Sequence, residues 1–177
     1  MENTVRILRE TRLDPRFPLS RRELAGLCAL ILDSLGLEGM PVTVKLVDDR
    51  EIARLNHEFL GCEGPTNVLS FPAEEPDEEE FLSEEAGDAD EADDMDGMDE
   101  ADNEDGEPAG LGELALSVDA LARETDLYGQ PPVAHLARLL AHGFLHLAGY
   151  DHGEAMYDLT DAAVDRALLE YPETEER

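Results

Sequence analysis

The chain places three histidines close together in its last third, in an arrangement that restricts the local fold. His142 and His146 are four residues apart, and His152 follows after Gly149. Residues four apart lie one turn above each other on one face of a helix, so the first two imidazole rings can point at one cation. Gly149 can take a positive φ and end the helix, which lets the chain turn back and bring in the third ring. The spacing predicts a metal site on a helix that ends at Gly149.

Three neutral imidazole nitrogens with a fourth position left open are typical of catalytic zinc, where a bound water is acidified to a pKa near ~7. The expected cofactor is Zn²⁺, one per chain. The alternatives are a structural zinc and a set of histidines in a hydrophobic core. Metzincin proteases share this spacing but carry Glu, their general base, after the first His, and this chain has Gly143 there. A metallopeptidase is therefore the weaker interpretation.

Two further segments accompany the histidines: Pro-Thr-Asn-Val-Leu-Ser-Phe-Pro at 65–72 and Gly-Glu-Leu at 112–114. Together with His-Gly-x-Leu-His-Leu-x-Gly-Tyr-Asp-His at 142–152, they resemble the bacterial YbeY family of ribosomal RNA maturation endoribonucleases. The likeness covers nearly the whole chain apart from one insertion.

The resemblance implies a small mixed α/β domain, with the three histidines as the zinc ligands. It implies single-stranded ribosomal RNA precursors as substrate, in processing of the 16S 3′ end and in ribosome quality control. It also implies the small ribosomal subunit or its proteins as partners. The residues implied to bind substrate are Asn56, Thr66, Asn67 and Ser70.

The chain departs from the family pattern where a cation is expected. Leu60 stands where the family usually has Arg after an aromatic residue, here Phe59, and the next four residues carry no cation. Arg138, one turn before the first histidine, is a candidate to replace that charge, or else a solvated helix arginine. Asp151 is a candidate partner for an imidazole N–H of a ligand. The catalytic base is unassigned, and a non-catalytic zinc-containing ribosome-assembly factor stays open as an alternative.

The acidic composition is unusual for a protein that binds RNA. The formal net charge is −31, whereas nucleic-acid affinity depends on cations that displace counterions from phosphates. About twenty of the 44 acidic residues lie within 74–109, which holds no Lys or Arg. Without them about 24 acidic and 13 basic residues remain, a charge of about −11. The RNA prediction therefore depends on the family resemblance and not on charge.

The composition of 74–109 cannot form a core, so this segment is predicted to be a disordered acidic insertion between two strands. One interpretation is a solubilising loop, and the other is a polyanion mimic that competes with RNA or gathers basic ribosomal proteins. A chain of 177 residues can bury one substantial core. We expect residues 1–177 to form a single metal-dependent hydrolase domain that contains this insertion.

The two cysteines, Cys28 and Cys62, are far apart and indicate no disulfide; the first is expected to be buried and the second to lie in a loop. No apolar run approaches a membrane span and the N-terminus has no export signal, so we expect a cytoplasmic protein with no membrane partner. His135 lies two turns before the first ligand, about 10 Å along the axis, and is too far to bind the same ion.

The remaining pattern predicts alternating strands and helices. Capping motifs after Ser20 and Asp48 indicate two helices, and Pro131-Pro132 opens the helix that carries the metal ligands. Further helices are expected over 118–128 and 156–169, and strands over 5–8, 42–47, 68–71 and 111–117. The predicted fold class is α+β (α/β-like): a mixed β-sheet of about four strands with helices packed on it.

Overall fold

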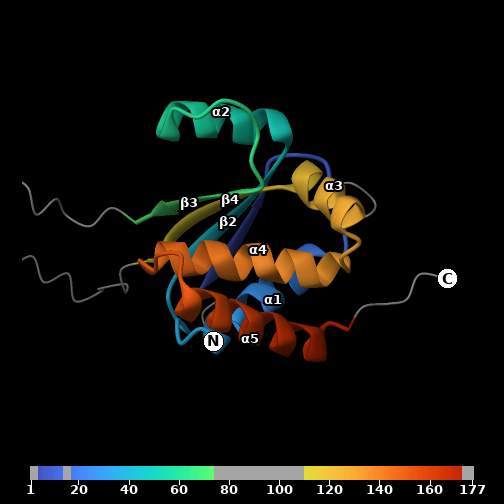
Figure 1. Ribbon diagram of the computed structural model, residues 1–177, viewed down its shortest axis with the longest axis vertical. Coiled ribbons are helices and arrows are strands. Elements are labelled where there is room, and N and C mark those ends of the chain that lie inside the picture. Colours follow the sequence, from blue (N-terminus) through green and yellow to red (C-terminus); the bar gives the residue numbers. More distant parts are fainter. Residues whose placement is uncertain (1–3, 14–16, 74–109, 173–177) are drawn as a thin grey trace, which may run out of the picture.

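A four-stranded sheet in the spatial order β1-β2-β4-β3 forms the centre of the fold (Figure 1). The computed structural model of the chain describes residues 4–13, 17–73 and 110–172. β1 pairs in parallel with β2, β2 in parallel with β4, and β3 pairs antiparallel with β4. The predicted mixed sheet of about four strands is confirmed. The strands are β1 (Val5–Arg9), β2 (Val42–Val47), β3 (Val68–Pro72) and β4 (Gly112–Ser117).

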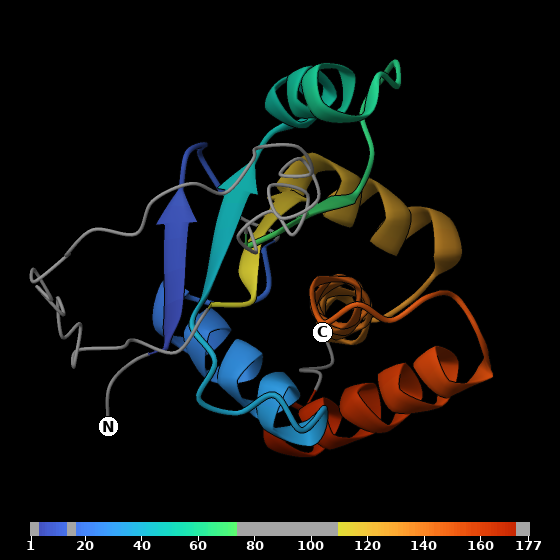
Figure 2. The same cartoon turned by 90° about the vertical axis from the view of Figure 1, so that its left-hand side faces the viewer.

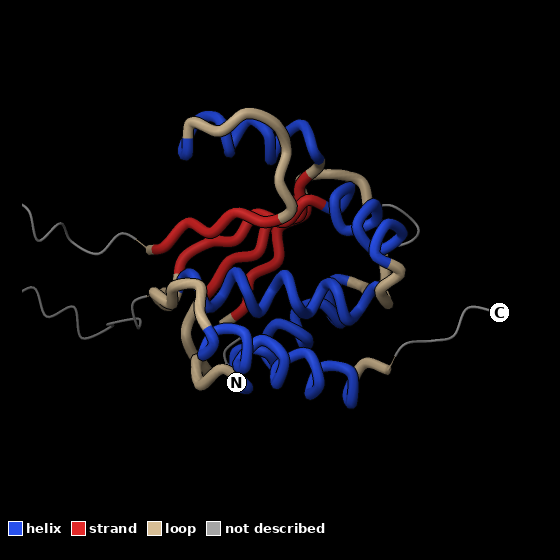
Figure 3. Tube along the Cα trace, in the orientation of Figure 1, coloured by secondary structure: helices blue, strands red, loops and turns tan. Residues whose placement is uncertain are grey.

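Helices cover the two faces of the sheet unequally. Figures 1 and 2 show α1, α4 and α5 stacked on one face, α2 alone over the other, and α3 at one end. The same layers are visible by element type in Figure 3. Within the described ranges, no helix is both long and apolar enough to cross a membrane. The helices are α1 (Arg21–Ser34), α2 (Asp49–Leu60), α3 (Val118–Tyr128), α4 (Pro132–Leu147) and α5 (Glu154–Glu170).

Side-chain caps begin the first two helices where the sequence predicts them. Ser20 Oγ accepts a hydrogen bond from the Glu23 amide, and the Glu23 carboxylate accepts one from the Ser20 amide. At α2, the Asp48 carboxylate accepts from the Glu51 amide at 2.8 Å. Each cap satisfies amides that have no partner within the helix and contributes about 0.5–2 kcal/mol.

The main hydrophobic core lies between the sheet and the α1, α4 and α5 layer. Cys28 is fully buried in it, as predicted, and burial raises the pKa of its thiol. Among the described residues, the opposite face holds a small buried cluster beneath α2, so the helix that carries the metal ligands lies on the well-packed side. The small cluster consists of Val47, Ile52, Leu69 and Ala115.

The strands on either side of residues 74–109 are hydrogen-bonded neighbours. The Ala73 amide donates to the Leu111 carbonyl at 3.1 Å, and Pro72 lies opposite Gly112 in the register. Gly112 has φ +125°, and a Cβ there would collide with the Phe71 carbonyl oxygen, so the pairing requires glycine. The segment predicted to be a disordered insertion lies outside the described residues.

Candidate metal centre

Three imidazole rings meet at the end of α4. One nitrogen from each of His142, His146 and His152 lies within 4.8 Å of the other two. The Nε2 atoms of His142 and His146 are 3.0 Å apart, and the ring centroids of His142 and His152 are 5.1 Å apart. The predicted convergence of the three side chains is therefore confirmed.

The end of α4 turns the chain so that the third ring can arrive. Gly149 has φ +91°. Its amide donates to the His146 carbonyl at 3.0 Å, and the Tyr150 amide donates to the Leu145 carbonyl at 3.0 Å. This pair of bonds is a Schellman motif, which ends a helix and requires a left-handed residue. The motif reverses the chain over a few residues and brings His152 back toward the two helical rings.

The donor set fits a zinc ion. Its ligand atoms are imidazole nitrogens, which zinc prefers, and three of them leave a fourth position for substrate. Burial, followed by the charges of His146 and His152, lowers the pKa of His142. The neutral ring that results is the form that can bind a metal.

Gly143 is buried against the sheet and has no room for a side chain. A Cβ there would lie 2.7 Å from Leu114 Cδ2, and Leu114 is itself fully buried. The Gly143 carbonyl accepts a hydrogen bond from the Ser70 hydroxyl at 3.2 Å, which ties α4 to β3. The position that carries the general base in metzincins therefore points into the core. This packing argues against a metallopeptidase more strongly than the missing carboxylate alone.

Asn56 and Thr66, two of the residues implied to bind substrate, lie in α2 and in the loop that follows it. Asn56 is buried, and its side-chain amide donates to the Gly64 carbonyl at 3.0 Å. Its role visible in the structure is to hold the loop that follows α2. Thr66 is half-buried just before β3. Among the side-chain hydrogen bonds of the described residues, Ser70 is the one of these four residues that bonds to α4.

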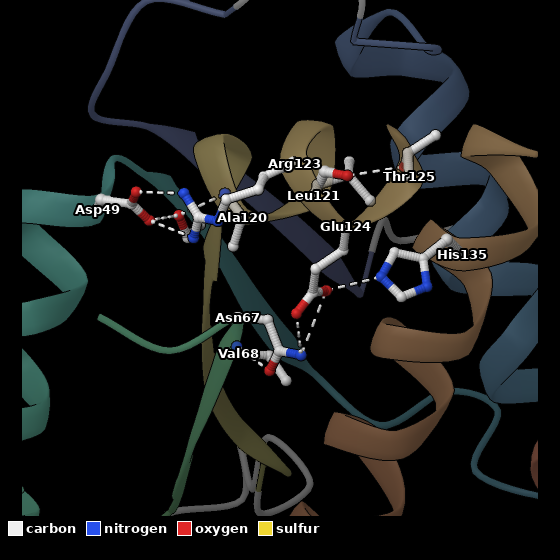
Figure 4. Close-up of polar contacts among 10 residues, drawn as sticks. Asp49, Asn67, Val68, Ala120, Leu121, Arg123, Glu124, Thr125 and His135 are labelled. Carbon is white, nitrogen blue, oxygen red and sulfur yellow. Dashed lines mark hydrogen bonds and ion pairs between the residues drawn. The ribbon is translucent and has the colours of Figure 1, made fainter. Parts of the chain in front are cut away.

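Asn67 belongs to a polar network that joins three elements (Figure 4). Its side-chain amide donates to Glu124 of α3 at 3.2 Å, and Glu124 Oε2 lies 2.7 Å from His135 Nε2. His135 is buried and is not part of the metal cluster, as expected. Sequence reasoning missed the role of Glu124, because its partner Asn67 lies 57 residues away.

A second network, also in Figure 4, holds α2 against α3. Arg123 donates to Asp49 at 2.8 Å, and the buried Ser117 hydroxyl donates to the same carboxylate at 2.9 Å. The Arg123 guanidinium is the main cause that keeps the pKa of Asp49 below its usual value. This contact positions α2, which covers the thinly packed face in the part of the chain that the structure describes.

The two candidate catalytic residues are both exposed. Arg138 Nη1 lies 3.0 Å from Asp161 Oδ1 on α5, so its charge is partly balanced. Asp151 lies in the turn between Gly149 and His152. At the end of α2, Leu60 is 61% exposed where the family resemblance leads us to expect an arginine. The roles of Arg138 and Asp151 stay predictions.

A comparison with protein families decides the identity of the chain. The family model described as Endoribonuclease YbeY matches residues 19–164. The chain belongs to the YbeY family. A YbeY relative named Endoribonuclease YbeY, from Oleidesulfovibrio alaskensis, is 48% identical over 159 residues and covers 85% of each chain. Another with that name, from Nitratidesulfovibrio vulgaris, is 43% identical over 154 residues and covers 86% of this chain and 88% of its own.

A solved structure supports the fold of this YbeY chain. The solution structure of TM1509 from Thermotoga maritima superposes with a TM-score of 0.58 at 22% identity, and covers 98% of this chain and 99% of its own. The family model and the two relatives confirm the family resemblance stated from the sequence motifs. The chain that carries the three-histidine cluster therefore belongs to a family of endoribonucleases.

Proposed function

We propose that this chain is a zinc-dependent endoribonuclease that hydrolyses single-stranded RNA. The observation that carries the proposal is the convergence of three imidazole nitrogens within 4.8 Å, in a chain of the YbeY family. Zinc suits three nitrogen ligands better than magnesium or calcium, which prefer oxygen. When bound, the ion supplies Lewis acidity at the phosphodiester.

The residues of the chain hold the ion and the strand. His142, His146 and His152 are the proposed zinc ligands. Arg138 is the proposed partner for a phosphate oxygen, since its pairing with Asp161 holds the guanidinium one turn before the first ligand. Asp151 is the proposed partner for an imidazole N–H of a ligand.

Ser70 lies at the junction of β3 and α4, where its hydroxyl bonds to the Gly143 carbonyl. We propose that Asn56, Thr66 and Asn67 contribute to substrate binding indirectly, by holding the segments around them in place. The side-chain amides of Asn56 and Asn67 already donate hydrogen bonds within the protein. The relatives are named endoribonucleases, and the family resemblance supports ribosomal RNA precursors as substrate. Processing of the 16S 3′ end, ribosome quality control and contact with small-subunit proteins, in the cytoplasm, belong to the same proposal.

A non-catalytic ribosome-assembly factor is the second candidate. It is favoured by Leu60, which is 61% exposed and cannot bind a phosphate. Beside it Phe59 is 59% exposed, and its ring packs edge-on against Phe71 with the centroids 5.2 Å apart. An apolar surface at this place suits a protein partner better than a phosphate.

One assay separates these functions. We expect the zinc-loaded protein to cleave labelled single-stranded RNA, to spare the matching duplex and to leave casein intact. Chelation should remove the activity, and added zinc should restore it. Cleavage of casein that is lost in His146→Ala would make the RNA assignment wrong. Binding to small ribosomal subunits without any RNA cleavage would favour the assembly factor.

Replacing residues 74–109 with a short Gly-Ser linker should leave the thermal midpoint nearly unchanged. The flanking Ala73 and Leu111 are already hydrogen-bonded, so a short linker can join them. Loop length alone changes the closure free energy by less than about 2 kcal/mol. The replacement makes the formal net charge less negative, from −31 to about −11. RNA affinity should therefore rise at low salt, and the gain should shrink as salt screens the charge.

A matched variant separates charge from length in this experiment. It keeps the length of 74–109 but carries Ser, Gly, Asn and Gln in place of the acidic residues. If charge repels RNA, this neutral variant should bind like the short linker, as measured by fluorescence anisotropy. Equal affinity of all three forms at low salt would leave only the solubilising role. A large fall in the thermal midpoint would contradict the prediction that residues 74–109 are a disordered insertion outside the folded core.

A further inference from the structure

An exposed tyrosine, Tyr157, lies in the first turn of α5, five residues after His152. Helices α4 and α5 cross at an inclined angle and are joined by the turn that carries His152 (Figures 1 and 2). The ion pair between Arg138 of α4 and Asp161 of α5, at 3.0 Å, sets their register. One turn along each helix toward the connecting turn lie His142 on α4 and Tyr157 on α5. Tyr157 is therefore one turn from the ion pair on α5, as the first metal ligand is on α4.

The tyrosine ring is exposed on a firmly held helix. Tyr157 is 59% exposed, whereas the adjacent Met156 is 1% exposed within the main core. The Tyr157 amide donates to the Gly153 carbonyl at 3.1 Å, and the Thr160 hydroxyl donates to the Met156 carbonyl at 2.8 Å. The backbone that presents the ring is thus anchored. An aromatic ring open to solvent is a common support on which single-stranded nucleic acids stack a base.

The charges around the ring decide which part of a nucleotide it can hold. Glu154, Asp158 and Asp161 are exposed on the same stretch of α5. Arg138 of α4 is paired with one of these carboxylates, Asp161. The carboxylates beside the ring repel phosphate, which is left to Arg138, but they do not repel the uncharged face of a base. Tyr157 is therefore suited to the base and not to the backbone of the strand.

We propose that Tyr157 stacks on an unpaired base next to the scissile phosphate, and so selects single-stranded RNA. The inference rests on the proposed function and deepens it. In a duplex the two faces of a base are covered by its neighbours, whereas a single strand can splay a base onto an aromatic ring. The tyrosine thus acts as a specificity-determining residue that touches the substrate.

The test compares Tyr157→Ala and Tyr157→Phe in the full zinc-loaded chain. The substrates are a short single-stranded RNA and versions with one abasic nucleotide at each position around the cleavage site. Tyr157→Ala should raise KM for the intact RNA by about tenfold or more, and Tyr157→Phe should restore it. When the abasic nucleotide replaces the one whose base stacks on Tyr157, the wild type and Tyr157→Ala should have the same KM, because the stacking contact is then absent from both. The loss should not depend on salt, because no phosphate contact is removed.

Tyr128→Ala is the matched control, since Tyr128 is 61% exposed but lies at the end of α3. It should leave KM unchanged. An equal loss for intact and every abasic RNA, or no rescue by Phe, would mean that the ring is only structural and would overturn the proposal.

A binding experiment tests base stacking by Tyr157 separately from RNA cleavage. RNA with 2-aminopurine at the position found above should change its fluorescence on binding the wild-type chain, and less so with Tyr157→Ala. This readout needs no cleavage. A wild-type chain that shows the change but cuts no RNA would defeat the proposed function alone, and no change at any position would overturn the stacking.

Discussion

His146→Ala should lose both bound zinc and RNA cleavage, with a fall in the cleavage rate of at least roughly 1,000-fold, about 4 kcal/mol. The substitution leaves two imidazoles of a cluster whose ligand atoms lie within 4.8 Å of one another. Two neutral nitrogens hold zinc far more weakly than three. Elemental analysis of the purified variant and single-turnover cleavage of single-stranded RNA measure the two losses.

The fold should survive this substitution, because His146 is only half-buried and lies in the last turn of α4. Far-UV circular dichroism checks that point. The matched control is His57→Ala, since His57 is an exposed histidine on α2 outside the metal cluster. It should retain zinc and activity. Full zinc occupancy and normal cleavage in His146→Ala would contradict the assignment of the metal centre.

Gly143→Glu should destabilise the protein by about 4 kcal/mol or more, a large part of the stability of a domain of this size. The added Cβ would lie 2.7 Å from Leu114 Cδ2, and the Leu114 side chain is fully buried. Overpacking alone costs about 1–3 kcal/mol, and an unpaired buried carboxylate adds several more. Urea unfolding followed by circular dichroism measures the loss.

A double substitution tests the cause. Gly143→Ala should cost about 1–3 kcal/mol, and Leu114→Ala about 2–5 kcal/mol. Together they should cost less than the sum, because Leu114→Ala removes the atoms that the new Cβ would meet. Strict additivity would show that the two positions do not clash. A stable Gly143→Glu variant that cleaves peptides would revive the metallopeptidase.

Patterns of residues that are close together in the sequence predicted the metal ligands and the helix caps. The histidine spacing predicts two rings on one helical face, and Gly149 predicts the turn that brings in the third. The caps at Ser20 and Asp48 are equally local, since each bonds to an amide three residues away. These features follow from the sequence because helix geometry brings together residues that are close along the chain.

Only the tertiary structure decided the contacts between distant residues. Ser70 bonds to Gly143, which is 73 residues away, and Asn67 meets Glu124 across 57 residues. Periodicity does not give the strand order β1-β2-β4-β3 or the contact between Arg138 of α4 and Asp161 of α5. Such contacts depend on how helices and strands pack, and a one-dimensional pattern records which face of an element is apolar but not which partner covers it.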